Sequence, residues 1–168
     1  PQGIANTLWA FARLRIKRES LFTGLASEAE ARVHEFNPQD IANTLWAFAK
    51  LGIKRESLFM CLASEAESRI REFNPQGIAT LAWAFAKSDL KRQSLFDCLA
   101  TETEARVHEF TPQSIANTAW AFATLNVKCE SVFARLTSEA ETRMSQFDAV
   151  AAGNLAWACE TVACATPA

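Results

Sequence analysis

The stretch Asn-Pro-Gln-Asp-Ile-Ala-Asn-Thr-Leu-Trp-Ala-Phe-Ala-Lys-Leu, residues 37–51, decides the fold because versions of it recur through the whole chain. Other versions begin at Pro1, Pro75 and Pro112, and a diverged one begins at Ala149. Their tryptophans follow one another at steps of 37 residues: Trp9, Trp46, Trp83, Trp120 and Trp157. A fixed period of this length is typical of stacked supersecondary units. The chain is therefore predicted to be a single repeat array.

The repeats follow one another without intervening residues. Four complete units span residues 1–37, 38–74, 75–111 and 112–148, and a partial unit spans 149–168. In the partial unit Ala149 and Val150 replace the Pro-Gln pair, and no second helix follows, so it is either a degenerate cap or a truncated repeat. Because the chain begins at Pro1, directly at a repeat and without an initiator Met, we expect it to be a piece of a longer protein.

Residues 38–74 show how one repeat is built. Asn37 is a suitable N-cap, Pro38 suits the first helical turn, and Gly52 suits a left-handed position after a helix that covers residues 38–51. A second helix is predicted from about residue 56 to 73, with Glu65 and Arg69 placed to form an i,i+4 ion pair. The same pair recurs in the other repeats, as Glu28–Arg32, Glu102–Arg106 and Glu139–Arg143.

Both helices of a repeat carry more apolar surface than one hairpin can bury, so neighbouring hairpins must stack. The predicted fold is all-α: a right-handed α-solenoid of about 4.5 helix–turn–helix repeats, with four hairpins and a ninth, terminal helix.

Composition fits a folded protein and excludes several classes. The chain is 49% hydrophobic and 21% charged, and its net charge of −2 argues against a generic polyanion binder. The five cysteines are odd in number and form no CxxC motif, which indicates reduced thiols in a reducing compartment rather than disulfides or a zinc site. No apolar run is long enough to span a bilayer, and no signal peptide is visible.

Catalytic and cofactor motifs are not found. The sequence contains no Gly-rich phosphate loop, nucleophile elbow or metal-ligand spacing. His34 and His108 share a repeat position, but Arg71 and Ser145 occupy it in the other repeats, which indicates an exposed helix position. We therefore predict that the chain is not an enzyme and binds no metal or cofactor.

The run Pro-Gln-x-Ile-Ala-Asn-Thr-Leu-Trp-Ala-Phe-Ala-Lys-Leu-Gly, followed by a helix with Leu-Phe and Leu-Ala, resembles the octotricopeptide repeats. It is also similar to the repeats found upstream of RAP domains in algae and related protists. The resemblance covers essentially the whole chain, although the period is one residue short and no RAP domain is present. It implies an α-solenoid that binds single-stranded RNA in a chloroplast or mitochondrion and acts in transcript stability, processing or translation.

The first candidate surface is a polar stripe along the first helix of each repeat. Modular RNA readers use such a layout, with one base per repeat read by two or three side chains. The stripe is centred on Ala10, Ala47, Ala84 and Ala121. Its predicted base-facing residues are Asn6, Asp40, Asn43, Thr80, Ser114 and Asn117. In the alternative interpretation, Asn6, Asn43, Asn117 and Asn154 form a structural ladder of hydrogen bonds between repeats.

The second candidate surface is a basic edge near the turn between the two helices of each repeat. A row of cations at repeat spacing suits a phosphate backbone. The edge comprises Arg13, Lys17, Arg18, Lys50, Lys54, Arg55, Lys87, Lys91, Arg92 and Lys128. It fades after the third repeat, so the first three repeats are expected to hold RNA best. Alternatively, the lysines at positions 17, 54, 91 and 128 neutralise the end of the preceding helix.

The tryptophans form a third candidate, since a base could stack on an exposed indole. A large aromatic residue at a fixed repeat position is more often part of the core between repeats, and this interpretation is favoured.

Single-stranded RNA is the favoured partner. The rival is a protein–protein scaffold, and a third possibility is the non-catalytic repeat region of a larger RAP-domain-type protein. No membrane role is predicted, and the sequence leaves the oligomeric state open.

Overall fold

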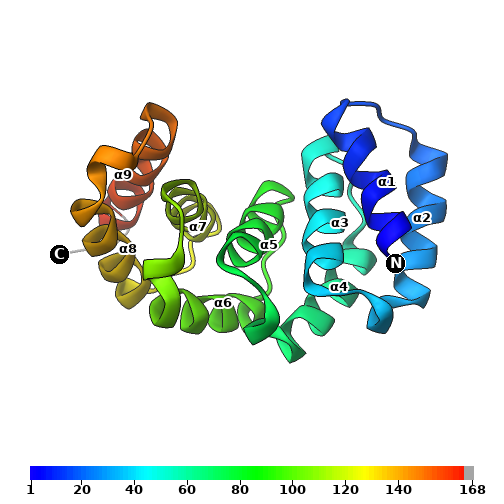
Figure 1. Ribbon diagram of the computed structural model, residues 1–168, viewed down its shortest axis with the longest axis horizontal. Coiled ribbons are helices and arrows are strands. Elements are labelled where there is room, and N and C mark those ends of the chain that lie inside the picture. The colour runs from blue at the N-terminus through cyan, green and yellow to red at the C-terminus, as the bar shows by residue number, and fades with distance from the viewer. Residues whose placement is uncertain (165–168) are drawn as a thin grey trace.

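A computed structural model describes residues 1–164 as helices joined by short turns. The helices are α1 (Gln2–Arg13), α2 (Glu19–Ala31), α3 (Pro38–Leu51), α4 (Glu56–Ser68), α5 (Pro75–Lys87), α6 (Gln93–Arg106), α7 (Pro112–Thr124), α8 (Glu130–Thr142) and α9 (Ala149–Cys164). Figure 1 shows them arranged as an arc, with the chain passing along it from one end to the other. The predicted all-α solenoid of four hairpins and a terminal helix is confirmed. Its handedness stays a prediction, and residues 165–168 of the partial repeat lie outside the described residues.

We call the odd-numbered helices A helices and the even-numbered ones B helices. The A helices α3, α5 and α7 each begin at a side-chain cap that their sequence provides. The Asn37 and Asp40 side chains cap each other's backbone N–H groups in a capping box, and Asn74 and Thr111 accept from the backbone N–H groups of Gly77 and Ser114. The first-turn proline has no N–H to leave unpaired. The cap predicted at Asn37 is thereby confirmed.

The A helices α1, α3, α5 and α7 are each followed by one residue in the left-handed conformation. Gly52 takes it with φ +63, as predicted, and Arg15, Asp89 and Asn126 take it at the equivalent position of the other repeats. Asp and Asn tolerate this conformation better than most side chains, whereas Arg15 is unusual there. The left-handed turn therefore forms in each of these repeats whether or not glycine occupies the position.

The B helices are shorter than predicted. The helix expected to continue to residue 73 ends at Ser68, because the Arg69 backbone (φ −130, ψ 23) leaves the helical region. A 3₁₀ turn follows over Ile70–Glu72, and the equivalent turns are Val33–Glu35, Val107–Glu109 and Met144–Gln146. The break directs the chain back toward the next A helix.

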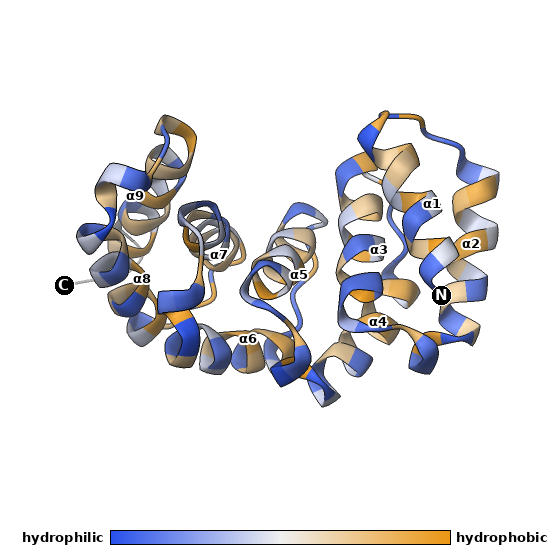
Figure 2. Ribbon diagram, viewed as in Figure 1, coloured by the Kyte–Doolittle hydropathy of each residue, from blue (hydrophilic) through white to orange (hydrophobic). Residues whose placement is uncertain are grey.

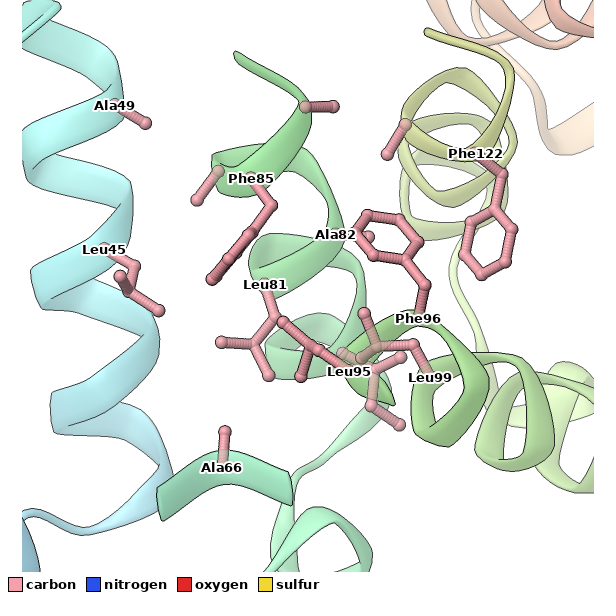
Figure 3. Close-up of a cluster of buried hydrophobic side chains, with 14 of the residues drawn as sticks. Leu45, Ala49, Ala66, Leu81, Ala82, Phe85, Leu95, Phe96, Leu99 and Phe122 are labelled. Carbon is pink, nitrogen blue, oxygen red and sulfur yellow. The ribbon is translucent and has the colours of Figure 1, made fainter. Parts of the chain in front are cut away.

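The core lies between successive repeats. Phe22 on α2 contacts Phe48 on α3 edge to face at 5.2 Å, and the pairs Phe59–Phe85 and Phe96–Phe122 repeat this contact at 5.3 and 5.1 Å. Figure 3 shows Phe85 and Leu81 of α5 beside Leu95 and Phe96 of α6. Such edge-to-face pairs add to the stabilisation that comes from burying the rings. Each hairpin thus gains its core from its neighbours, as the repeat pattern requires.

A helices pack closely against the preceding and following A helices, whereas B helices make far fewer contacts with one another. The buried Ala47, Ala84 and Ala121 allow this close approach because they add little side-chain bulk between the axes. Figure 2 shows polar residues along the outward turns and apolar residues where helices meet. Closer spacing of the A helices bends the array, so that α5 and α7 lie on the inner side of the arc and α6 on the outer side (Figure 1).

Cys61, Cys98, Cys129 and Cys159 are free thiols in the structure. Among the helices described, none is both long and apolar enough to cross a bilayer.

Candidate nucleic-acid interface

On the A helices α3, α5 and α7, only a narrow arc of the helix surface is accessible to solvent. Neighbouring A helices cover both flanks of each, and B helices cover the back. On α3 this arc carries Gln39, Asn43, Trp46 and Lys50. Their spacing of four, three and four residues places them one above another along one helix face. Equivalent lines are Gln76, Thr80, Trp83 and Lys87 on α5, and Gln113, Asn117, Trp120 and Thr124 on α7. We call these three lines together the concave groove.

The predicted stripe was wrong at Asp40, whereas Ser114 lines a depression in the concave groove although little of its side chain is exposed. Asp40 is 5% exposed and Ser114 is 4% exposed, and both side chains lie in the caps at the start of their helices. The alanine at the predicted centre of the stripe is buried in α3, α5 and α7. These positions face the preceding A helix, so the accessible line is rotated away from them toward the glutamine and the tryptophan.

The other predicted base-facing residues lie on the accessible face. Asn6 is exposed, and Asn43, Thr80 and Asn117 are half-buried. The Thr80 hydroxyl donates to the Gln76 carbonyl oxygen at 2.7 Å, within its own helix. Within residues 1–164, the amides of Asn6, Asn43, Asn117 and Asn154 form no hydrogen bond to another repeat, which contradicts the structural-ladder interpretation. These amides are thus free to donate and accept toward a ligand.

Two depressions lie in the concave groove. The first, between α3 and α5, has a volume of about 360 Å³ and is lined by Gln39, Asn43, Gln76 and Gly77 among others. A Cβ at Gly77 would lie 3.2 Å from both Asn74 Oδ1 and Phe73 Cδ1, so a side chain there would crowd the N-cap and the Phe73 ring. The second, of about 540 Å³, is lined by Trp46, Lys50, Trp83 and Asn117 among residues of α3, α5 and α7. It therefore crosses from one repeat to the next.

The tryptophans are neither fully core nor fully exposed. Trp46, Trp83 and Trp120 pack with one part against the core and leave another part accessible, and Trp9 and Trp157 at the two ends are 40% and 44% exposed. Arg13 lies over the Trp9 ring at 5.1 Å and Lys50 over the Trp46 ring at 6.0 Å. The favoured core interpretation is therefore incomplete, because the indole edges also face the groove.

The basic edge divides into residues that face solvent and residues that hold repeats together. Arg13, Lys50 and Lys87 are exposed at the end of the concave groove, and Lys54 and Lys128 are exposed in the turns. Lys17 pairs with Glu19 at 3.2 Å, and Arg18 is exposed. Lys91 donates to the Asn126 carbonyl oxygen at 3.3 Å, in the turn after α7 of the next repeat, so it joins two repeats rather than neutralising the end of the helix that precedes it.

The phosphate-binding prediction was wrong for Arg55 and Arg92. Arg92 donates to both carboxylate oxygens of Glu67, at 2.6 and 2.8 Å, across the junction between α4 and α6. Arg55 approaches Glu30 to 3.6 Å at the preceding junction. The hydrogen bonds from Arg92 lower the pKa of the Glu67 carboxyl. Both arginines are therefore structural, and they lie on the B-helix side of the array.

Sequence reasoning missed Gln39, Gln76 and Gln113 as groove residues. A signal was present, because glutamine occupies the second position of all four complete repeats and is exposed in each.

Stacked helical hairpins that share a continuous polar groove define a helical-repeat protein of the α-solenoid class. The chain belongs to the RNA-editing substrate-binding complex 6 protein family, whose profile matches residues 1–164. Comparison with curated proteins gives no match. The family is thus a helical one named for an RNA-related complex, and its match does not single out octotricopeptide or RAP-associated repeats.

Proposed function

We propose that this chain binds single-stranded RNA along the concave groove, as part of an assembly that holds RNA for editing. The observation that carries the proposal is the line of amide, indole and cation on α3, repeated on α5 and kept without its cation on α7. These are the groups that single-stranded nucleic acids need: amides for base edges, aromatic rings for stacking and cations for phosphates. The family name, which refers to a complex that binds editing substrates, supports the same class of ligand.

The geometry suggests how a strand would lie. The groove crosses the A helices, so a strand that follows it meets a glutamine–asparagine–tryptophan line on α3 and α7 and a glutamine–threonine–tryptophan line on α5. Lys50 and Lys87 at one end of these lines are placed to meet phosphates, while the amides meet bases. The groove's role is binding, and we propose no catalytic step for this chain. An organellar setting, in a mitochondrion or chloroplast, is proposed from the sequence resemblance alone.

The test is fluorescence anisotropy with a labelled pool of single-stranded RNA at two salt concentrations. The first variant is Asn43→Ala with Gln76→Ala, which removes two amides from the first depression. Lys50→Gln and Arg71→Gln form a second, matched pair, because each removes one exposed cation, but only Lys50 lies in the groove. We expect the groove variants to weaken binding several-fold and Arg71→Gln to leave it nearly unchanged. Equal weakening by Lys50→Gln and Arg71→Gln, or no RNA binding by the folded protein at low salt, would overturn the proposal.

A protein–protein role is the second candidate, and one observation favours it. On the B-helix side, the Glu104 carboxylate lies at the junction between α6 and α8. The arginine that approaches the equivalent carboxylate at the two preceding junctions is not present there.

A further inference from the structure

Arginine ties the B helices together at two successive junctions. At the α4–α6 junction, Arg92 binds the Glu67 carboxylate with two hydrogen bonds, and it also donates to Ser64 Oγ at 3.1 Å and to the Met60 carbonyl oxygen at 3.3 Å. At the α2–α4 junction, Arg55 occupies the same repeat position, 3.3 Å from Ser27 Oγ and 3.6 Å from Glu30. At both junctions, therefore, a guanidinium lies against a glutamate carboxylate and a serine hydroxyl of the preceding B helix.

The third junction keeps the hydroxyl and the carboxylate that contact the guanidinium elsewhere, but it lacks the arginine. Between α6 and α8, Thr101 and Glu104 stand where Ser64 and Glu67 stand one repeat earlier, and Cys129 replaces the arginine. An open depression at this junction is lined by Thr101, Glu104, Ala105, Ser131, Ala134 and Arg135. It lies on the B-helix side, away from the concave groove.

The Glu104 carboxylate has no cationic partner in the part of the chain that the structure describes. Its Oε1 accepts from Ser131 Oγ at 2.6 Å, and the Cys129 thiol lies 3.9 Å from the same oxygen. Arg135, on the rim, donates to the Glu104 backbone carbonyl at 3.2 Å and does not form an ion pair with the carboxylate. A half-buried carboxylate with a free oxygen is therefore presented beside a hydroxyl.

We propose that this depression is a docking site for an arginine side chain of a protein partner. A guanidinium placed as Arg92 is placed would meet Glu104 with two parallel hydrogen bonds and reach Thr101 with a third. Arginine fits better than lysine, because its planar fork matches the two carboxylate oxygens, whereas an ammonium binds them as a point charge. The site is separate from the concave groove, so RNA and the arginine-bearing protein could be bound together, and the inference does not depend on RNA binding.

The test uses N-acetyl-argininamide as the probe and N-acetyl-citrullinamide as its neutral isostere, with binding followed by NMR shifts of the Thr101 and Ser131 amides. We expect saturable shifts with the arginine compound at millimolar concentration and none with the citrulline compound. Cys129→Arg fills the site from within and Glu104→Gln removes its charge, so each should abolish the saturable shifts. Arg92→Cys is a matched gain-of-binding variant, because it removes the arginine from the α4–α6 junction and leaves the Glu67 carboxylate without its guanidinium partner. It should add a second set of saturable shifts, at the Ser64 and Ser94 amides.

Circular dichroism establishes that each variant is folded before its result is used. If Cys129→Arg disturbs the fold, Glu104→Gln and the citrulline comparison decide the question. Absence of saturable shifts in the wild-type protein overturns the proposal, as does unchanged binding in a folded Glu104→Gln variant. Equal binding of the arginine and citrulline compounds would also overturn it, since charge and fork geometry are what the site offers.

Discussion

Arg69 donates a hydrogen bond from Nη1 to the carbonyl oxygen of Phe36, at 2.9 Å, and so joins the end of α4 to the preceding repeat. Arg106 and Arg143 make the same contact with the Phe73 and Phe110 carbonyl oxygens. The sequence shows these arginines only as members of local i,i+4 ion pairs, which the structure confirms. Their larger role is to tie one repeat to the next.

Replacing Arg106 by Met should therefore destabilise the fold by about 1–3 kcal/mol, because it removes charge-assisted hydrogen bonds and leaves the Phe73 carbonyl oxygen without its partner. Urea unfolding followed by circular dichroism measures the change. Arg32→Met is the matched control, since Arg32 forms the local ion pairs but, among the residues described, no hydrogen bond to another repeat. A loss for Arg32→Met as large as that for Arg106→Met would show that the contact between repeats contributes little.

The N-cap of α5 can be tested through a substitution that the chain already contains. Asn74→Ala should cost about 1 kcal/mol, because the Gly77 N–H loses the side-chain oxygen that lies 2.7 Å away. Asn74→Thr should be close to neutral, since Thr111 caps α7 in the same way. Thermal unfolding of the two variants beside wild type provides the comparison, and equal losses would rule out capping as the reason.

The Arg92–Glu67 pair predicts how stability depends on pH. Arg92 lowers the pKa of Glu67 below its ordinary value of 4.5, so the ionised carboxyl stabilises the folded state above that pH. The contribution is lost as the pH falls from about 4.5 through the lower folded-state pKa. We expect Glu67→Gln to be less stable than wild type at pH 7 and to lose less stability than wild type on acidification. Urea unfolding at several pH values between 7 and 3 tests this, and parallel curves for the two proteins would contradict it.

Trp83 is placed for stacking, because it lies on the middle one of the three helices, α3, α5 and α7, that line one depression of the concave groove. Trp83→Leu keeps an apolar side chain against the core but removes the stacking surface. RNA affinity should fall by about 1–3 kcal/mol if a base stacks there. Anisotropy titration measures the affinity, and the melting temperature of the variant shows whether packing has also changed. Unchanged affinity in a stable variant would remove Trp83 from the proposed interface.

Salt dependence distinguishes phosphate contacts from base contacts. For single strands, each phosphate contact contributes about 0.7 to the slope of log affinity against log salt. Lys50→Gln with Lys87→Gln should thus reduce the slope by about 1.4 if both lysines meet phosphates. Asn43→Ala should weaken binding while leaving the slope nearly unchanged. A slope that stays the same in the double lysine variant would place the phosphates elsewhere.

The repeats, the hairpins and most of their boundaries could be predicted because they depend on local signals. Asn37, Pro38 and Gly52 act within one helix or at its ends, and the tryptophan period needs only counting. The B-helix ends could not be placed, because Arg69 leaves the helical conformation where its side chain contacts the previous repeat.

The groove was only half predictable for a similar reason. A helical projection separates apolar from polar residues, but it does not show that other A helices cover both flanks of α3. Asp40 was expected to face a base because it is polar, yet it serves the cap and is buried by the preceding repeat. The roles of Arg55 and Arg92 were missed because their carboxylate partners lie 25 residues away along the chain.

Close packing of the A helices and sparse contact between B helices give the array a mechanical asymmetry. The inner side resists compression and the outer side can open, so bending should occur mainly by widening the gaps between B helices. At the junction between α6 and α8, Cys129 replaces the arginine that approaches a carboxylate at the two preceding junctions, so we expect the array to open there first. A partner's side chain bound at this junction would hold α6 and α8 at a fixed distance. It would thereby fix the curvature of the concave groove to which an RNA strand is proposed to bind.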